Sequence, residues 1–519
     1  MSPLLRFGAL LFFLTTSLFS VSFSRGMFNS PDETANAFFI RQYVRTGSFR
    51  VAEPLNVIGE DIIHPRAVAI VKHDLAPGSF LGMLLLYGWI AKILGLWIVP
   101  LLTPLFATIA SIVFYKLVRL LFDDRIARRS FFILLAHPAW IYYTARSLFP
   151  NVLFLSLLII GLYLLFRCQL SVVSCQLSGI IIGSALAVRT SEAGWVLGAL
   201  GLLWIFQQRQ GAPLHARAPL VVLAGIVIAF LPIFYYNSEL YGNPFYNGYS
   251  QIDSEAVPAA FAWHFQSRFL STLFSLLLPF GINPLVLLQN AYQYLIWFFW
   301  WLAIPTILGV IMMARRKKLT TYNLQLTTYI FVTSWLVLYY GSWQFRDTTL
   351  SGPTLGTSFT RYWLPIFVFG TPFAAIALTT FQREWARFFL FGCMIFLSAS
   401  LLFARTGESF AAMRSTFSRN RSIKQSVLDR TESSAVILTE RTDKLFFPER
   451  RVMFNDPLDQ KKIDRVVSLL ANRVPIYYFT ELQKHDIDFM NANRLAQYNV
   501  AWSGGEEIRG QRLYQLEQL

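Results

Sequence analysis

The sequence predicts a polytopic α-helical membrane protein with a small soluble α/β domain at its C-terminus. The chain of 519 residues is 55% hydrophobic and only 14% charged, whereas soluble domains carry roughly 25% charged residues. Apolar runs of roughly 17–25 residues, the length that crosses about 30 Å of hydrocarbon as a helix, recur along most of the chain before residue 405. Beyond that point charged residues become frequent and the hydrophobic periods become short.

The distribution of basic residues supports a membrane protein. A formal net charge of +16 would suggest a nucleic-acid partner in a soluble protein. Here the basic residues form short clusters between apolar runs, as in Arg125 to Arg129 and Arg315 to Lys318, which is typical of cytoplasmic loops. We therefore expect no nucleic-acid partner. The three cysteines are too few for a disulfide framework or a Cys-rich zinc site.

The first apolar run, Phe7 to Ser24, is predicted to be a retained transmembrane helix. A signal peptide is the alternative, but no cleavage site of small residues follows the run. Trp97 to Phe122 is the next strong span. The weaker segment between them, Phe80 to Leu96, is predicted to lie along the outer surface, because a crossing there would place Arg125 to Arg129 outside.

Nine further spans complete about eleven crossings, with the N-terminus inside and the C-terminus outside. They are 131–147, 152–167, 178–194, 195–206, 218–236, 285–313, 319–340, 363–381 and 387–404. The sequence thus predicts a transmembrane domain, 1–404, that includes a first external loop, 25–96, and an extracytoplasmic domain, 405–519. Alternating patterns in the second domain predict strands at 436–439, 452–454, 476–480 and 498–502 and helices at 462–472 and 481–496.

The sharpest local feature is the acidic pair Asp32 and Glu33, directly after the first helix. Paired carboxylates can act as a general base and its orienting partner, or hold a metal ion through hard oxygen ligands. A structural role is the alternative, in which Asp32 caps a helix running through Ala35 to Arg45. The residues alone leave both roles open.

Three later stretches extend this pattern. They are Lys72-His73-Asp74-Leu75-Ala76-Pro77-Gly78 before an amphipathic helix, Tyr241-Gly242-Asn243-Pro244, and Arg361-Tyr362-Trp363-Leu364-Pro365. Together with the acidic pair after the first helix, they resemble the C-type (GT-C fold) glycosyltransferases, especially the bacterial and archaeal relatives of the protein O-mannosyltransferases in family 39. The resemblance covers roughly residues 1–405 in layout.

The resemblance implies a GT-C-like membrane glycosyltransferase that inverts the anomeric centre. It would transfer a sugar from a polyprenyl-phosphate donor to an acceptor hydroxyl at the outer face of the membrane. The implied roles fall into three groups: the catalytic Asp32 and Glu33; the donor-phosphate ligands Arg361, Lys72 and His73; and a substrate loop with Tyr241, Asn243, Tyr249 and Tyr362. An arginine suits phosphate because its planar fork donates two parallel hydrogen bonds.

The same resemblance implies a multi-pass protein of the plasma membrane whose active site and C-terminal domain are extracytoplasmic. Its partners would be the lipid-linked donor, membrane lipid and an acceptor that is a protein, a lipid or a glycan. Many relatives carry an acidic residue at the outer start of the fourth span, where this chain has Asn151. No metal ligand is therefore assigned, and a divalent metal ion stays open as a cofactor.

Structural roles remain open for other polar residues. Arg361 could instead be an interfacial arginine that extends its charge to the headgroups. Arg189 and Glu192 lie inside an apolar segment and are expected to pair with each other. His137 and Pro138 are expected to pack and to kink a span. At the level of the whole chain, a transporter or flippase and a non-enzymatic scaffold are the rival functions.

Overall fold

The computed structural model describes residues 2–23, 27–167, 172–209, 218–250, 274, 277–315, 321–344, 352–404, 407–454 and 460–519. The chain forms two compact units. The first unit comprises Met1–Val21, Pro100–Leu231 and Ser254–Met413, and the second comprises Ser22–Val99, Pro232–Asp253 and Arg414–Leu519. Within the predicted basic cluster Arg315 to Lys318, residues 316–318 lie outside the described residues.

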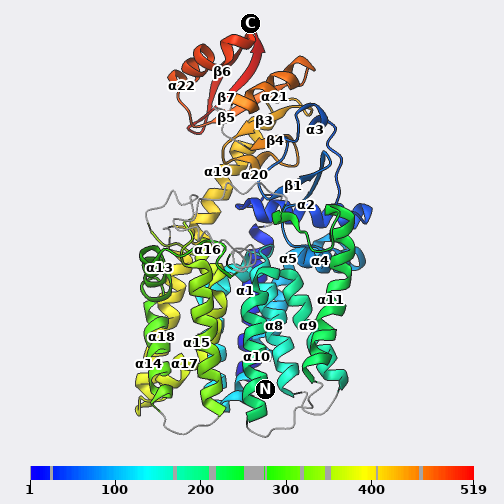
Figure 1. Ribbon diagram of the computed structural model, residues 1–519. Helices are drawn as coiled ribbons and strands as arrows, with labels where there is room; N and C mark the ends of the chain where they lie inside the picture. Colours follow the sequence, from blue (N-terminus) through cyan, green and yellow to red (C-terminus); the bar gives the residue numbers. More distant parts are fainter. Residues whose placement is uncertain are drawn as a thin grey trace. The chain divides into compact units, whose positions relative to one another are not determined.

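The first unit is a bundle of apolar helices, many of them running in nearly parallel or antiparallel directions (Figure 1). The helices are α1 (Pro3–Phe23), α5 (Val99–Leu121), α6 (Asp124–Ala136), α7 (Pro138–Ala145), α8 (Pro150–Arg167), α9 (Val172–Val188), α10 (Ala193–Arg209), α11 (Ala218–Tyr241), α13 (Pro284–Ala291), α14 (Trp300–Ala314), α15 (Thr321–Tyr340), α16 (Ser358–Tyr362), α17 (Leu364–Leu378) and α18 (Glu384–Phe403). From Pro232 on, the residues of α11 belong to the second unit. Helix α8 packs on α9, α10 on α15, and α17 on both α6 and α14.

Small residues allow the closest helix contacts in this bundle. A Cβ added to Gly179 of α9 would come within 2.2 Å of the Val222 carbonyl oxygen of α11. One turn later, a Cβ on Gly183 would lie 2.7 Å from the Ile226 Cα. Helices in lipid associate through such backbone approach, because the surrounding acyl chains offer no hydrophobic driving force. The spacing of the two glycines therefore fixes how α9 packs on α11.

Several predicted spans are interrupted. Among the described residues, five helices are long and apolar enough to cross a membrane, or seven if each of two bent pairs counts as one span. The predicted span 131–147 breaks at His137, between α6 and α7. Helix α9 meets α10 at a bend of 116°, and α14 follows the preceding helical segment at 98°. The polytopic helical fold is confirmed, and the count of eleven crossings stays a prediction.

The second unit contains a five-stranded mixed sheet with the order β4-β3-β5-β7-β6 (Figure 1). Its strands are β3 (Val436–Thr439), β4 (Arg451–Phe454), β5 (Ile476–Thr480), β6 (Val500–Ile508) and β7 (Gln511–Gln518). Strand β3 is parallel to β4 and β5, whereas β7 is antiparallel to β5 and β6. The unit's other elements are α2 (Pro31–Thr46), α3 (Leu55–Ile58), β1 (Val68–Val71), β2 (Asp74–Pro77), α4 (Leu81–Leu94), α19 (Phe410–Leu428), α20 (Asp443–Phe446), α21 (Gln460–Ala471) and α22 (Lys484–Met490).

The structure divides the chain differently from the predicted boundary, which grouped the loop 25–96 with the transmembrane domain. Ile62 and Ile63 from this loop are buried in the core of the sheet with Leu469 and Trp502. Arg66 forms an ion pair with Asp443 at 2.7 Å. These partners lie hundreds of residues away along the chain, so the loop folds with the C-terminal segment because its apolar side chains complete that core.

Helix α4 occupies the segment predicted to lie on the membrane surface. It has 14 residues, and Gly95 ends it with a φ of 93°. At 1.5 Å per residue the helix is about 21 Å long, shorter than the roughly 30 Å of hydrocarbon. It packs against α2, where a Cβ on Gly88 would clash with the Tyr43 ring. The structure thus confirms a separate helix in this segment. Its position along the membrane surface stays a prediction.

Candidate functional site

The acidic pair lies in the first turn of α2, in the second unit. Ser30 is the N-cap of this helix and its side chain accepts a hydrogen bond from the Asp32 backbone N–H at 3.3 Å. The capping role considered for Asp32 is therefore filled by Ser30. Glu33 is only 4% exposed, whereas Asp32 is partly exposed. Both carboxylates suit the positive end of the helix dipole, and Asp32 is the one that solvent reaches more readily.

Two of the singled-out motifs contact each other in the same unit. The Tyr241 hydroxyl donates to the Pro77 carbonyl oxygen at 2.7 Å. Gly248 packs on the same turn, since a Cβ there would come within 2.2 Å of that oxygen. The Asn243 side chain accepts from a backbone N–H two residues later. Tyr241 and Asn243 thus hold the shape of the loop, while the Tyr249 ring is 54% exposed and lies 4.9 Å from the Phe80 ring.

Lys72 and His73 form the tip of the β1–β2 hairpin. Both have positive φ angles, 52° and 69°, as in the two-residue turns that match the twist of a hairpin. The His73 Nδ1 lies 2.9 Å from an Asp61 carboxylate oxygen. Strand pairing places the tip at the opposite end of the hairpin from Pro77. The role of these two residues as phosphate ligands stays a prediction.

Two arginines gather on one aromatic ring in the first unit. The Arg361 guanidinium, in the last turn of α16, lies 4.7 Å from the centroid of the Phe149 ring. The Arg146 guanidinium lies 4.7 Å from the same centroid, and the residue is only 4% exposed. Each cation is attracted to a face of the ring, so both positive charges pack on Phe149. Their arrangement suits a doubly or singly charged phosphate.

Sequence reasoning missed Arg146. The residue stands at the end of the predicted span 131–147, shortly before Pro150 and the start of α8. A charged residue at such a helix end is usually an interfacial anchor, so its position carried no functional signal. Its burial beside Arg361 depends on a contact across more than 200 residues of sequence, and only the fold reveals it.

Hydrogen bonds fix this arginine pair in place. The Arg361 Nη2 donates to the Ser358 hydroxyl at 3.1 Å, and the Asn151 side-chain amide donates to the Arg361 carbonyl oxygen at 3.1 Å. The Arg146 Nη1 donates to the Tyr142 hydroxyl at 3.1 Å. An ionised carboxylate at position 151 could not donate that bond. The amide at the start of α8 therefore positions the backbone that carries Arg361.

Tyr362 joins the arginine pair to a second polar cluster. Its ring stacks on Tyr340 with centroids 4.7 Å apart, and both Arg361 and Arg189 lie 5.0 Å from its centroid. Arg189 forms the expected ion pair with Glu192 at 2.7 Å, across a short turn between α9 and α10. The Tyr340 hydroxyl also donates to Glu192 at 2.8 Å. The predicted pairing of Arg189 with Glu192 is confirmed.

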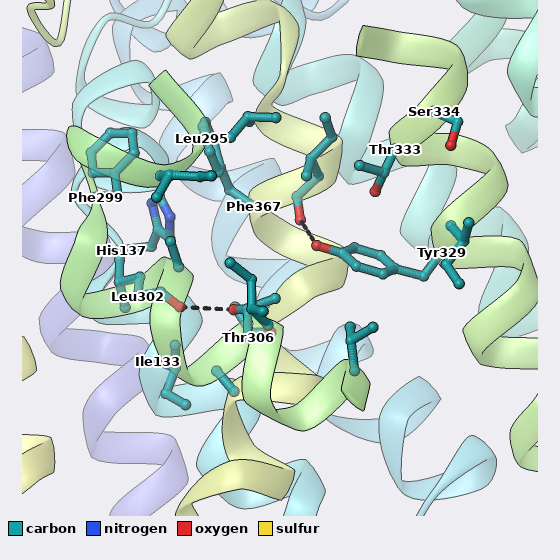
Figure 2. Close-up of a pocket in the computed structure, with 18 residues that line it drawn as sticks. Ile133, His137, Leu295, Phe299, Leu302, Thr306, Tyr329, Thr333, Ser334 and Phe367 are labelled. Atoms are coloured by element: carbon teal, nitrogen blue, oxygen red, sulfur yellow. Dashed lines mark hydrogen bonds between the residues drawn. The ribbon is translucent and has the colours of Figure 1, made fainter. Parts of the chain in front are cut away.

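A cavity of about 320 Å³ lies between α6, α14, α15 and α17 (Figure 2). Its walls are mainly apolar, with hydroxyl groups of Thr306, Tyr329 and Ser334 among them. The His137 ring stacks on Phe367 with centroids 5.1 Å apart, and its Nδ1 accepts from a backbone N–H at 3.2 Å. His137 thus has the packing role expected at the break between α6 and α7.

The cavity is also close to the arginine pair along the chain. Its lining includes Ile366, Phe367, Thr371 and Ala374 of α17, which begins just after Arg361. At 1.5 Å per residue these side chains lie about 8–20 Å further along the helix direction than Arg361. The first unit therefore holds an apolar space within reach of Arg361.

A metal centre has no ready ligand set in the part of the chain that the structure describes. No three His, Cys, Asp or Glu side chains form a group there that could hold a metal ion. The described residues therefore give no ligands to assign.

Comparison with known proteins identifies the fold. No protein-family profile matches the chain, and no curated protein matches it in sequence. ArnT from Cupriavidus metallidurans bound to undecaprenyl phosphate is similar in structure, with a TM-score of 0.54 and 12% sequence identity over 98% of this chain and 97% of ArnT. The apo state of the same protein is similar with a TM-score of 0.56 and 12% identity over 98% of each chain. The apo oligosaccharyltransferase of Archaeoglobus fulgidus is also similar (TM-score 0.53, 12% identity, 91% of this chain and 69% of the other). The chain therefore has the GT-C fold that the sequence resemblance implies.

Proposed function

We propose that the protein is a membrane glycosyltransferase that takes its sugar from a polyprenyl-phosphate donor. The observation that carries this proposal is the pair formed by the buried Arg146 and the half-buried Arg361 on the Phe149 ring, in a fold shared with an ArnT that was solved bound to undecaprenyl phosphate. Ionisable residues at membrane depth are costly and usually serve substrates. A lipid phosphate supplies the anion that two neighbouring guanidinium groups attract.

The donor's phosphate binds between these two arginines. Guanidinium groups donate pairs of parallel hydrogen bonds to phosphate oxygens, and such charge-assisted bonds are strong away from bulk water. The prenyl chain then runs along α17 into the apolar cavity beside His137 (Figure 2). A cavity of about 320 Å³ holds only part of a long prenyl chain, so the rest of it lies in the surrounding lipid.

Asp32 is the general base in this proposal. Its carboxylate takes the proton of an acceptor hydroxyl while the acceptor oxygen attacks the anomeric carbon. The bond between that carbon and the phosphate oxygen breaks, the electron pair stays on the phosphate, and the anomeric centre inverts. The charge that develops on the leaving phosphate is stabilised by Arg361 and Arg146. Glu33 orients Asp32, and Tyr362 contributes aromatic surface for the sugar.

The acceptor is a hydroxyl group of a protein, a lipid or a glycan on the extracytoplasmic side of the plasma membrane. The positive-inside rule places both the acidic pair and the C-terminal domain on that side. The loop 25–96 folds against the C-terminal sheet through Ile62 and Ile63. The C-terminal segment therefore holds the loop that follows Asp32 and is a good candidate for presenting the acceptor.

Transfer of a radiolabelled sugar tests this proposal. The purified protein is reconstituted in vesicles and offered a panel of polyprenyl-phosphate sugars with protein, lipid and glycan acceptors. We expect label in one acceptor class from at least one donor. A protein that moves the intact labelled lipid across the bilayer without transferring its sugar would be a flippase, and this result would overturn the proposal.

A further inference from the structure

A second groove, far larger than the cavity beside His137, opens on the surface of the first unit. It encloses about 900 Å³ along α1, α6 and α18. One end is lined by charged side chains, which are Arg128, Arg129, Arg387 and Glu384. The positive-inside rule assigns this end to the cytoplasm, because the cluster precedes the apolar run of α6 and the start of α18. The groove's lining includes neither Arg146 nor Arg361, the proposed ligands of the donor phosphate.

Arg129 is the central residue of the charged end. Its Nη1 is buried and has no hydrogen-bond partner in the residues that the structure describes. Burial, followed by the positive charges of Arg387 and Arg125, lowers the pKa of its guanidinium, and Asp123 opposes this shift. A buried donor without a partner and with cationic neighbours is a costly arrangement. An anion at this position would relieve both the missing bond and the repulsion.

Protein carboxylates satisfy only part of this charge. Arg128 is largely exposed and pairs with Asp124, one turn earlier on α6. Glu384 is the one carboxylate among the groove's lining residues. The Arg387 side chain donates to the backbone carbonyl oxygens of Phe381 and Gln382. Because these acceptors are neutral, the two bonds do not cancel the positive charge of Arg387. The end of the groove is therefore net positive.

The remainder of the groove is apolar and faces outward. Phe7 of α1 is 63% exposed and Phe388 of α18 is 75% exposed, while the Phe132 and Phe391 rings meet at its floor with centroids 6.4 Å apart. The lining of α1 runs from Leu4 to Thr16, about 18 Å at 1.5 Å per residue. This length is close to half of the roughly 30 Å hydrocarbon thickness, which is the depth that the acyl chains of one leaflet occupy.

We propose that this groove binds one anionic phospholipid of the membrane, with its phosphate between Arg129 and Arg387 and its acyl chains along α1 and α18. The charged end fits an anionic headgroup and the apolar walls fit acyl chains, and a phospholipid has both. Inorganic phosphate would leave the apolar walls unfilled. Basic pockets between membrane helices are known to select anionic headgroups. The bound lipid would tie the first helix to α6 and α18, and this role is independent of sugar transfer.

Native mass spectrometry of the full-length protein tests the proposal, with phosphatidylglycerol and phosphatidylcholine offered in equal amounts. We expect one tightly held phosphatidylglycerol. The double change Arg129→Gln and Arg387→Gln should weaken its binding about 25-fold, since each basic residue contributes about fivefold to binding an anionic lipid surface. Arg383→Gln is the matched control, because this exposed arginine lies on the same turn and outside the groove's lining, and it should change retention less than twofold.

A groove-filling change keeps the test valid if the double variant folds poorly. Ala399 lines the apolar part of the groove, and Ala399→Phe should exclude the acyl chains while every arginine remains. Phosphatidylglycerol should then be lost from this variant too. Equal retention of phosphatidylcholine by the native protein, or unchanged retention of phosphatidylglycerol in both the folded double variant and Ala399→Phe, would overturn the proposal.

Discussion

The two units hold their candidate phosphate ligands in opposite ways. In the first unit, Arg146 and Arg361 are packed on Phe149 and tied to Tyr142 and Ser358. In the second unit, Lys72 and His73 project from a hairpin tip. Water solvates an exposed cation at little cost, whereas a buried one must be stabilised by other groups or by a ligand. Burial therefore separates the candidate phosphate ligands more clearly than their presence in a family motif does.

The acidic residues show the same contrast. Glu192 is buried in the first unit and accepts hydrogen bonds from Arg189, Tyr340 and Trp195. Asp32, in the second unit, stands partly exposed in the first turn of α2. Burial closes Glu192 off from an incoming substrate, whereas solvent reaches Asp32. We accordingly expect Glu192 to support the structure and Asp32 to support the chemistry.

The largest expected effect is a loss of turnover on changing Asp32, which would distinguish its role from that of Glu192. Asp32→Asn should reduce single-turnover sugar transfer by about 10²–10⁴-fold, the usual loss for a positioned general base. Thermal unfolding should change little, because Ser30 rather than Asp32 caps the helix. Glu33→Gln is the neighbouring control and should cost less activity. Full transfer by folded Asp32→Asn would remove the catalytic role and leave the carboxylate as a helix-end charge.

Removing the other carboxylate should mainly affect stability. Glu192→Ala leaves Arg189 as a buried charge without its partner, and breaking such a pair typically costs about 3–5 kcal/mol. We expect a large fall in the melting temperature in detergent. Glu506→Ala is the matched control, because it breaks an equally short but exposed pair with Arg430 and should shift melting little. Similar falls in the melting temperature of both variants would mean that the buried ion pair of Glu192 contributes no more to stability than the exposed pair of Glu506.

A smaller effect is expected on donor affinity. Arg361→Ala should weaken binding of a polyprenyl phosphate by about 1.5–3 kcal/mol, the range for a charge-assisted hydrogen bond. Arg361→Lys should restore only part of this loss, because an ammonium cannot form the bidentate fork. Lys72→Ala and His73→Ala should have little effect on donor affinity, because both side chains are exposed at the hairpin tip. A loss in these two variants as large as that in Arg361→Ala would restore the hairpin to the phosphate site.

The smallest expected effect is a dependence of stability on pH in the second unit. Burial lowers the pKa of His64 from 6.5, and this outweighs the opposing hydrogen bond to Pro65 and the charge of Asp443. The unfolded chain therefore binds a proton more readily than the folded one, so stability should fall as the pH drops below about 6.5. Melting curves between pH 7.5 and 5 should show this slope, and His64→Gln should flatten it. An unchanged slope in the variant would assign the acid sensitivity to other groups.

Much of the helical architecture could be predicted because it depends on local sequence. Apolar runs located α1, α5, α8 and α18 to within a few residues, and alternating patterns located β3, β4 and β5. Strand β7 was missed, because Gln511–Gln518 is rich in charged and amide side chains. The β1–β2 hairpin was also missed, since Pro77 and Gly78 suggested only a turn.

The candidate site was only partly predictable because its contacts are long-range. Asp32 and Arg361 could be selected from their motifs, and the pairing of Arg189 with Glu192 from their spacing. Arg146 required the fold, since Phe149 brings it to a residue more than 200 positions away. Ile62 and Ile63 likewise show no sequence sign of the sheet core that they join, because this core forms from segments far apart along the chain.

The most direct test of this account is the affinity of the purified protein for undecaprenyl phosphate, measured for a double-mutant cycle of Arg146→Gln and Arg361→Gln. Each folded single variant should bind about 10- to 150-fold more weakly. The double variant should lose less than the product of the two effects, because both side chains grip one phosphate. Native affinity in the folded double variant would contradict the central claim that Arg146 and Arg361 together hold the donor.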